Sequence, residues 1–138
     1  MTIALDHTVV VVADKEAAAR WFARIFGLTY AGLAGPFASV PINDSLTLDF
    51  DDRSPTPAPQ HYAFSMSDAE FDAVLARIKA ESIAFGSDPR SPTDGKIGTW
   101  GGRRRAYFAD TDQHFYEVIA FSASSSDAGG LGHEAATR

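Results

Sequence analysis

The chain contains no cysteine among its 138 residues. This absence excludes disulfide bonds, thiolate metal ligands and cysteine nucleophiles, and it is typical of a protein from a reducing compartment. No uninterrupted apolar run approaches the roughly 20 residues that a transmembrane helix needs, and the first residues lack the basic region and apolar core of a signal peptide. The sequence therefore predicts a cytoplasmic protein.

Basic residues are scarce relative to acidic ones. Lys and Arg number 12 against 18 Asp and Glu, which gives a formal net charge of −6. This charge repels nucleic-acid phosphates and anionic membranes alike, and the only basic run, residues 103–105, is too short to reverse it. The sequence therefore predicts no nucleic-acid partner and no membrane partner.

Histidines accompany two apolar strands. His7 lies in the valine-rich run of residues 5–12, and His61 begins the strand that follows a proline-rich break. Such β-branched runs are typical of buried strands. Because side chains alternate along a strand, His7 shares a face with Val9 and Val11. Each histidine is thus a polar exception within an otherwise apolar strand.

A helix is predicted after each of these strands. Asp14 suits the N-cap of a helix over residues 15–27, whose apolar residues recur every three or four positions. Ser67 and Glu70 form a capping box at the start of the second helix. Residues 86–102 are predicted as a long loop. Further short strands are predicted at residues 29–31, 37–42, 45–51, 83–85, 104–109 and 114–121.

The order of strand, helix and three strands occurs twice, which indicates an internal duplication. His7 precedes Asp14 by seven residues, and His61 precedes Asp68 by the same seven. The proline-rich residues 53–59 separate the halves, because alternate prolines remove backbone donors and fix an extended chain.

This duplicated arrangement resembles the vicinal oxygen chelate superfamily, which includes glyoxalase I, bleomycin resistance proteins, fosfomycin resistance transferases and extradiol dioxygenases. The resemblance covers residues 3–121. It implies an α+β fold in which two βαβββ modules form an open, curved mixed sheet around a cavity. The modules would comprise residues 1–52 and 60–121 of one domain, with residues 122–138 as a disordered tail. The resemblance also implies a homodimer and a small-molecule substrate or ligand.

The same resemblance implies that His7, His61 and Glu117 bind a divalent metal ion. Two neutral imidazoles and one carboxylate suit Fe, Mn, Ni or Zn and leave coordination positions open for substrate oxygens. Burial of Glu117 in an apolar strand would be costly without a cationic partner. The alternative is that the two histidines are hydrogen-bonded core or rim residues.

The reaction is less defined by the sequence. Tyr107 matches the position of an active-site tyrosine in the ring-cleaving dioxygenases, but no histidine lies between His61 and His114, which disfavours extradiol cleavage. Val9 replaces a threonine found in the fosfomycin transferases and disfavours their reaction. Glyoxalase I uses a fourth ligand from the last strand of the first module, where this chain offers Asp49 or, in the neighbouring register, the non-ligating Leu48.

Three further residues are candidates for substrate binding. Arg103 and Arg105 share one strand face with Tyr107 and would suit an anionic substrate. Trp100 lies in the predicted loop and could close over a ligand. The alternatives are a solvated basic strand end and a tryptophan packed on the protein's own surface or on a second subunit.

These residues predict a small metal-dependent enzyme of the lyase, isomerase or dioxygenase type that acts on a small oxygenated substrate. The alternative is a metal-free binding protein like the bleomycin resistance proteins. Retention of His7, His61 and Glu117 favours the enzyme, whereas the acidic net charge would attract cationic compounds and favours the binding protein.

Overall fold

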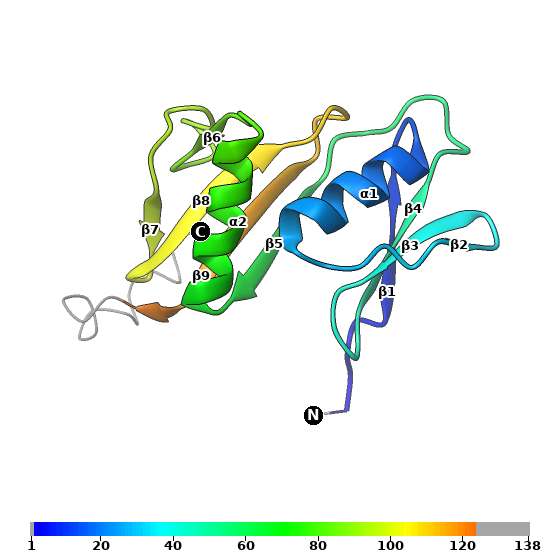
Figure 1. Cartoon of the computed structure of the whole chain (residues 1–138), viewed down its shortest axis with the longest axis horizontal. Helices are drawn as coiled ribbons and strands as arrows, with labels where there is room; N and C mark the ends of the chain where they lie inside the picture. Colours follow the sequence, from blue (N-terminus) through cyan, green and yellow to red (C-terminus); the bar gives the residue numbers. More distant parts are fainter. Residues whose placement is uncertain (1, 124–138) are drawn as a thin grey trace. The chain divides into compact units, whose positions relative to one another are not determined.

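The computed structural model describes residues 2–123 and divides the chain into two compact units between Ala58 and Pro59 (Figure 1). Over these residues each unit contains one helix and one open sheet, which confirms the predicted α+β fold of two βαβββ modules. The predicted tail begins at residue 122, but Ser122 and Ala123 still belong to the last strand, and residues 124–138 lie outside the described part. Neither described helix is long and apolar enough to cross a membrane.

The first module consists of one helix and a four-stranded sheet in the order β1-β4-β3-β2. Strands β1 and β4 are parallel, and the other pairs are antiparallel. The Asp14 carboxylate caps the helix by accepting from the Ala17 N–H, as predicted, and Gly27 ends it with a φ of 70°. The elements are β1 (His7–Val11), α1 (Lys15–Phe26), β2 (Leu33–Ala34), β3 (Phe37–Pro41) and β4 (Thr47–Asp51).

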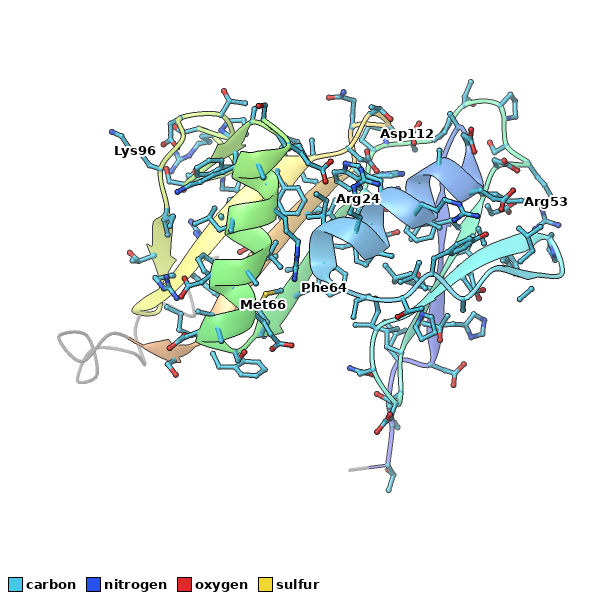
Figure 2. The ribbon with its side chains drawn as sticks, in the orientation of Figure 1. Arg24, Arg53, Phe64, Met66, Lys96 and Asp112 are labelled. Carbon is cyan, nitrogen blue, oxygen red and sulfur yellow. The ribbon has the colours of Figure 1, made fainter. Side chains whose placement is uncertain are left out.

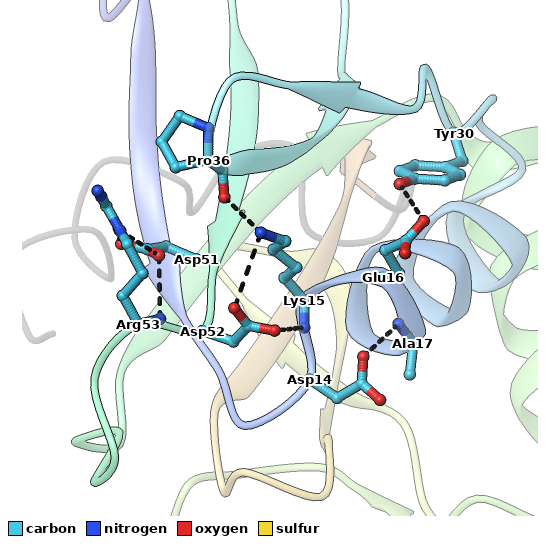
Figure 3. A network of polar contacts seen from close by, with 9 residues as sticks. All are labelled: Asp14, Lys15, Glu16, Ala17, Tyr30, Pro36, Asp51, Asp52 and Arg53. Carbon is cyan, nitrogen blue, oxygen red and sulfur yellow. Dashed lines mark hydrogen bonds and ion pairs between the residues drawn. The ribbon is translucent and has the colours of Figure 1, made fainter.

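Charged side chains connect the end of β4 to the start of α1 (Figure 3). The backbone N–H of Lys15 donates to Asp52 at 3.1 Å, and its Nζ donates to the Pro36 carbonyl at 2.8 Å. Arg53 donates from Nε and Nη2 to the two oxygens of Asp51, and this hydrogen bonding lowers the pKa of Asp51. These contacts fix the chain as it leaves the first sheet.

The second module repeats this plan with one added strand. Its sheet has the order β5-β9-β8-β6, and β7 also pairs with β8. Strands β5 and β9 are parallel, as β1 and β4 are in the first module. Figure 1 shows α2 lying across β8 and β9. The elements are β5 (His61–Met66), α2 (Asp68–Ala80), β6 (Phe85–Gly86), β7 (Gly98–Trp100), β8 (Arg103–Ala109) and β9 (Phe115–Ala123).

Each sheet packs one face against its helix. In the first module, Phe50 is fully buried and its ring lies 5.9 Å from that of Phe22 in α1. In the second, Arg104 lies over the ring of Phe71 in α2, and Val118 is fully buried. Because side chains alternate along a strand, the residues between these point to the face that no helix covers. The predicted site residues lie on these helix-free faces.

Two predicted segments are wrong. Residues 29–31 are not a strand, because Gly32 turns the chain with a φ of 90° and β2 begins only at Leu33. The predicted loop over residues 86–102 contains β7, which pairs with β8 through a tight turn at Gly101 and Gly102, both with positive φ. Two adjacent glycines are a hairpin signal, and here they join two strands. The predicted strand at residues 83–85 is shifted and lies at Phe85–Gly86.

The capping box of α2 yields a stability prediction. Ser67 Oγ accepts from the Glu70 N–H at 3.1 Å, and Glu70 Oε1 accepts from the Ser67 N–H at 3.0 Å. Ser67→Ala removes the cap and should lower the free energy of unfolding by about 1 kcal/mol in urea denaturation. Ser67→Thr keeps a hydroxyl and should lose clearly less. Equal losses in the two variants would show that the hydroxyl does not stabilise the helix.

Candidate functional site

Glu117 is the buried charge around which the site in the second module forms. It lies in the middle of β9 with 0% of its surface exposed. In the sheet register it stands between Ala63 of β5 and Tyr107 of β8, on the helix-free face. A carboxylate buried to this extent needs charged or hydrogen-bonding groups around it, because transfer of its charge out of water is costly.

His61 provides one of these groups. Its Nε2 lies 3.0 Å from Glu117 Oε1, and its side chain is 46% exposed. Both atoms are good ligands for divalent transition metals. Two ligand atoms that each lie roughly 2.1 Å from one ion are about 3 Å apart, so the observed separation fits a shared metal ion. The structure thus brings together His61 and Glu117 of the predicted ligand set.

Tyr107 lies beside this pair. It is opposite Glu117 in the register of β8 and β9, and its ring lies edge-on to the His61 ring at 5.8 Å between centroids. Burial, with the charge of Glu117 adding to it, raises the pKa of Tyr107 to about 12. Its phenol therefore stays protonated near neutral pH and can donate a hydrogen bond to the Glu117 carboxylate.

Arg103 and Arg105 lie on this same helix-free face. Arg105 Nη2 donates to Asp88 Oδ2 at 3.2 Å, and its Nη1 lies 4.0 Å from Glu117 Oε2. Arg103 crosses β9, donating from Nε to the Ala120 carbonyl and from Nη2 to Ser65 Oγ. The shared face was correctly predicted from alternation. Substrate binding by these arginines remains a prediction.

Trp100, the residue predicted to close over a ligand, lies next to these arginines along the chain. Trp100 is half-buried at the end of β7, where it pairs with Arg103 of β8. A strand thus fixes its backbone, whereas the sequence predicted a loop. Lys96 is exposed on the outside of the module, on the segment that precedes β7 (Figure 2). Substrate contact by Trp100 remains a prediction.

His7 belongs to the first unit, so each unit holds only part of the predicted metal set. Within residues 2–123, no group of three His, Asp or Glu side chains forms that could hold a metal ion. His7 Nδ1 lies 2.8 Å from Asp6 Oδ2, and this hydrogen bond raises the pKa of His7, with the charge of Asp49 acting in the same direction. A carboxylate on Nδ1 orients an imidazole so that Nε2 can bind a metal.

Asp49 is the counterpart of Glu117 in the first module. It pairs with Val9 of β1 and with Ser39 of β3, just as Glu117 pairs with β5 and β8. It therefore shares the helix-free face with His7, whereas Leu48 is buried on the opposite face. The register therefore places Asp49, and not Leu48, on the face of His7, and a ligand role for Asp49 remains a prediction.

Ser39 was missed by the sequence reasoning. Its hydroxyl donates to Asp49 Oδ1 at 2.6 Å, and it occupies the place that Tyr107 has in the second module. The duplication would have identified it only with the strand register known, because serine and tyrosine share no obvious sequence signal.

His114 has a structural role. It is fully buried, and its Nδ1 accepts from the Gln60 N–H at 3.0 Å. The backbone N–H of His114 donates to the Asp110 carboxylate in the preceding turn. The contact of His114 with Gln60 joins the end of the proline-rich segment to the start of β9.

Comparisons with known proteins identify the family. The model of the Glyoxalase/Bleomycin resistance protein/Dioxygenase superfamily matches residues 4–118. The oxidases ChaP-H2 and ChaP-H1 are 38% and 36% identical to the chain, each with a TM-score of 0.83. The first match covers 91% of this chain and 98% of ChaP-H2, and the second covers 88% of this chain and 98% of ChaP-H1.

More distant structures share the fold. The fosfomycin resistance protein FosX from Listeria monocytogenes, complexed with Mn(II) and sulfate, is 21% identical, with a TM-score of 0.65 over 92% of this chain and 95% of that one. A comparison with curated protein sequences finds no match. The family match and the two oxidases show that the chain belongs to the glyoxalase/bleomycin resistance protein/dioxygenase superfamily, also called the vicinal oxygen chelate superfamily.

Proposed function

We propose that the protein is a metal-dependent enzyme that performs oxidative chemistry on a small oxygenated molecule. The observation that carries this proposal is the buried Glu117 carboxylate with His61 Nε2 at 3.0 Å from it. The oxidative class is supported by the 38% identity to oxidase ChaP-H2 over almost the whole of that protein.

The donor set fits a divalent metal ion. His7 and His61 would supply imidazole nitrogens and Glu117 a carboxylate oxygen, which is a ligand set of Fe, Mn, Ni and Zn sites with open positions. The related FosX structure contains Mn(II), which supports a divalent ion in this fold. Asp49 is the candidate fourth ligand, because it shares the helix-free face of the first sheet with His7. A bound ion of this kind would polarise an oxygen of the substrate or promote its reaction with an oxidant.

The chain's own residues would prepare the site for this chemistry. Tyr107 stays protonated near neutral pH, because its pKa is raised to about 12, so its hydroxyl can donate a hydrogen bond that orients the Glu117 carboxylate. Arg103 and Arg105 make the helix-free face basic, which suits the phenolate, enolate or carboxylate oxygens of a small substrate. We assign Trp100 to the substrate side of the same face, since it pairs with Arg103.

Metal content tests the proposal. Protein purified without chelator or nickel resin should contain close to one divalent ion per chain, measured by plasma mass spectrometry. Glu117→Gln removes the anionic ligand at nearly constant volume and should reduce the content at least about tenfold, since it removes a charged ligand. Glu81→Gln, at the end of α2, is the matched control and should retain the wild-type content.

The same low metal content in wild type and Glu117→Gln would contradict the metalloenzyme proposal. A folded protein that binds small aromatic or cationic compounds without metal would then support the sequestering function.

We also propose that the protein is a homodimer, as the family resemblance implies. Size-exclusion chromatography with light scattering should give twice the 14.8 kDa mass of one chain, independent of loading concentration. A mass of one chain across the concentration range would contradict a dimer.

A further inference from the structure

We infer that Asp88 is a positioning residue that holds the Arg105 guanidinium away from Glu117 and so keeps the Glu117 carboxylate available to a metal ion. Asp88 lies on the segment between β6 and β7, outside the predicted ligand set. The inference rests on the proposed function, because the availability of Glu117 matters only if an ion binds there.

Arg105 lies between two carboxylates and hydrogen-bonds to one of them. Its Nη2 donates to Asp88 Oδ2 at 3.2 Å, whereas its Nη1 remains 4.0 Å from Glu117 Oε2, beyond hydrogen-bond distance. The guanidinium also lies over the Tyr107 ring, with 5.3 Å from Cζ to the centroid. A small displacement toward Glu117 would therefore convert this long ion pair into a hydrogen-bonded one.

Judged by burial alone, a hydrogen-bonded pair of Arg105 with Glu117 would be stronger than its pair with Asp88. Arg105 is 15% exposed and Glu117 0%, whereas the Asp88 side chain is 35% exposed. Charge-assisted hydrogen bonds gain strength where water is excluded, so the buried carboxylate would be the preferred partner of a freely placed guanidinium. The observed pairing with Asp88 indicates that the position of Asp88 decides where Arg105 lies.

A fixed turn holds Asp88 in this position. Asp88 Oδ1 accepts from the Arg90 N–H at 2.9 Å, and the Asp88 carbonyl accepts from the Ser91 N–H at 2.9 Å. The turn then packs on Gly86 of β6, where an added Cβ would collide with the Ser91 carbonyl oxygen. Asp88 is thus part of a turn packed closely against the sheet, and its carboxylate is preorganised to receive Arg105.

The two positions of Arg105 have opposite effects on a metal ion. When it is paired with Asp88, its charge is partly neutralised and Glu117 Oε2 remains 4.0 Å from Nη1, beyond hydrogen-bond distance. When Arg105 is paired with Glu117, it would occupy a ligand oxygen and place a positive charge next to the ion. Both effects would weaken binding of the metal ion. Asp88 should therefore strengthen metal binding without contacting the ion.

A double-mutant cycle tests this role. Asp88→Asn removes the charge but keeps an oxygen for the Arg90 N–H, and it should weaken Mn(II) binding by about tenfold in calorimetry of the metal-free protein. In an Arg105→Gln background the same change should have almost no effect, because the competing guanidinium is gone. Asp94→Asn is the control: this carboxylate lies in the same segment and accepts from Ser87 and Lys96.

Equal weakening by Asp88→Asn in both backgrounds, or no weakening in either, would overturn the inference, since the effect would then not pass through Arg105. Equal weakening by Asp88→Asn and Asp94→Asn would overturn it as well, because it would show a general effect of the loop or its charge. If the wild-type protein binds no Mn(II) at all, the proposed function fails and this inference fails with it. Unfolding midpoints of all variants separate these results from a loss of fold.

Discussion

Burial of the Glu117 charge is the constraint on which the site in the second module depends. A carboxylate with no exposed surface, in the middle of a central strand, is stable only where its neighbours offset the loss of water. His61, Tyr107 and Arg105 surround it from the two flanking strands, and each bears a nitrogen or hydroxyl donor. Burial also makes this carboxylate a good metal ligand, since a cation is the most effective partner for a buried anion.

The internal duplication explains how such a site arises. Both modules place a histidine at the start of the first strand and a carboxylate two residues along the parallel partner strand, on the same face. The modules then diverge. Glu117 is fully buried next to the His61 ring, whereas Asp49 is bound by Ser39 and His7 by Asp6. In the second module the histidine and the carboxylate are therefore in contact and the carboxylate is buried. The corresponding residues of the first module are more exposed to solvent.

The sequence was sufficient for features that depend on local chemistry. The equal spacing of seven residues from His7 to Asp14 and from His61 to Asp68 predicted the two modules. Ser67 with Glu70 predicted the start of α2, because capping is decided within one turn. Because side chains alternate along a strand, Arg103 and Arg105 of β8 were predicted on one face. The strand at residues 29–31 was wrong because the backbone turn at Gly32 outweighs the propensity of a short segment, and β7 was missed because its glycine-rich sequence resembles a loop.

Features that depend on contacts distant in sequence were not predictable. The contact between Asp88 and Arg105 joins a turn to a strand, and only the packing of that turn on Gly86 brings the two together. The approach of His61 to Glu117 was implied by family resemblance, but its distance follows from the parallel register of β5 and β9. Anomalous diffraction from crystals soaked in Mn(II) is the most direct test of this account. A peak within roughly 2.0 to 2.3 Å of His61 Nε2 and a Glu117 oxygen is predicted, whereas Glu117 hydrogen-bonded to Arg105 with no peak beside it would contradict the account.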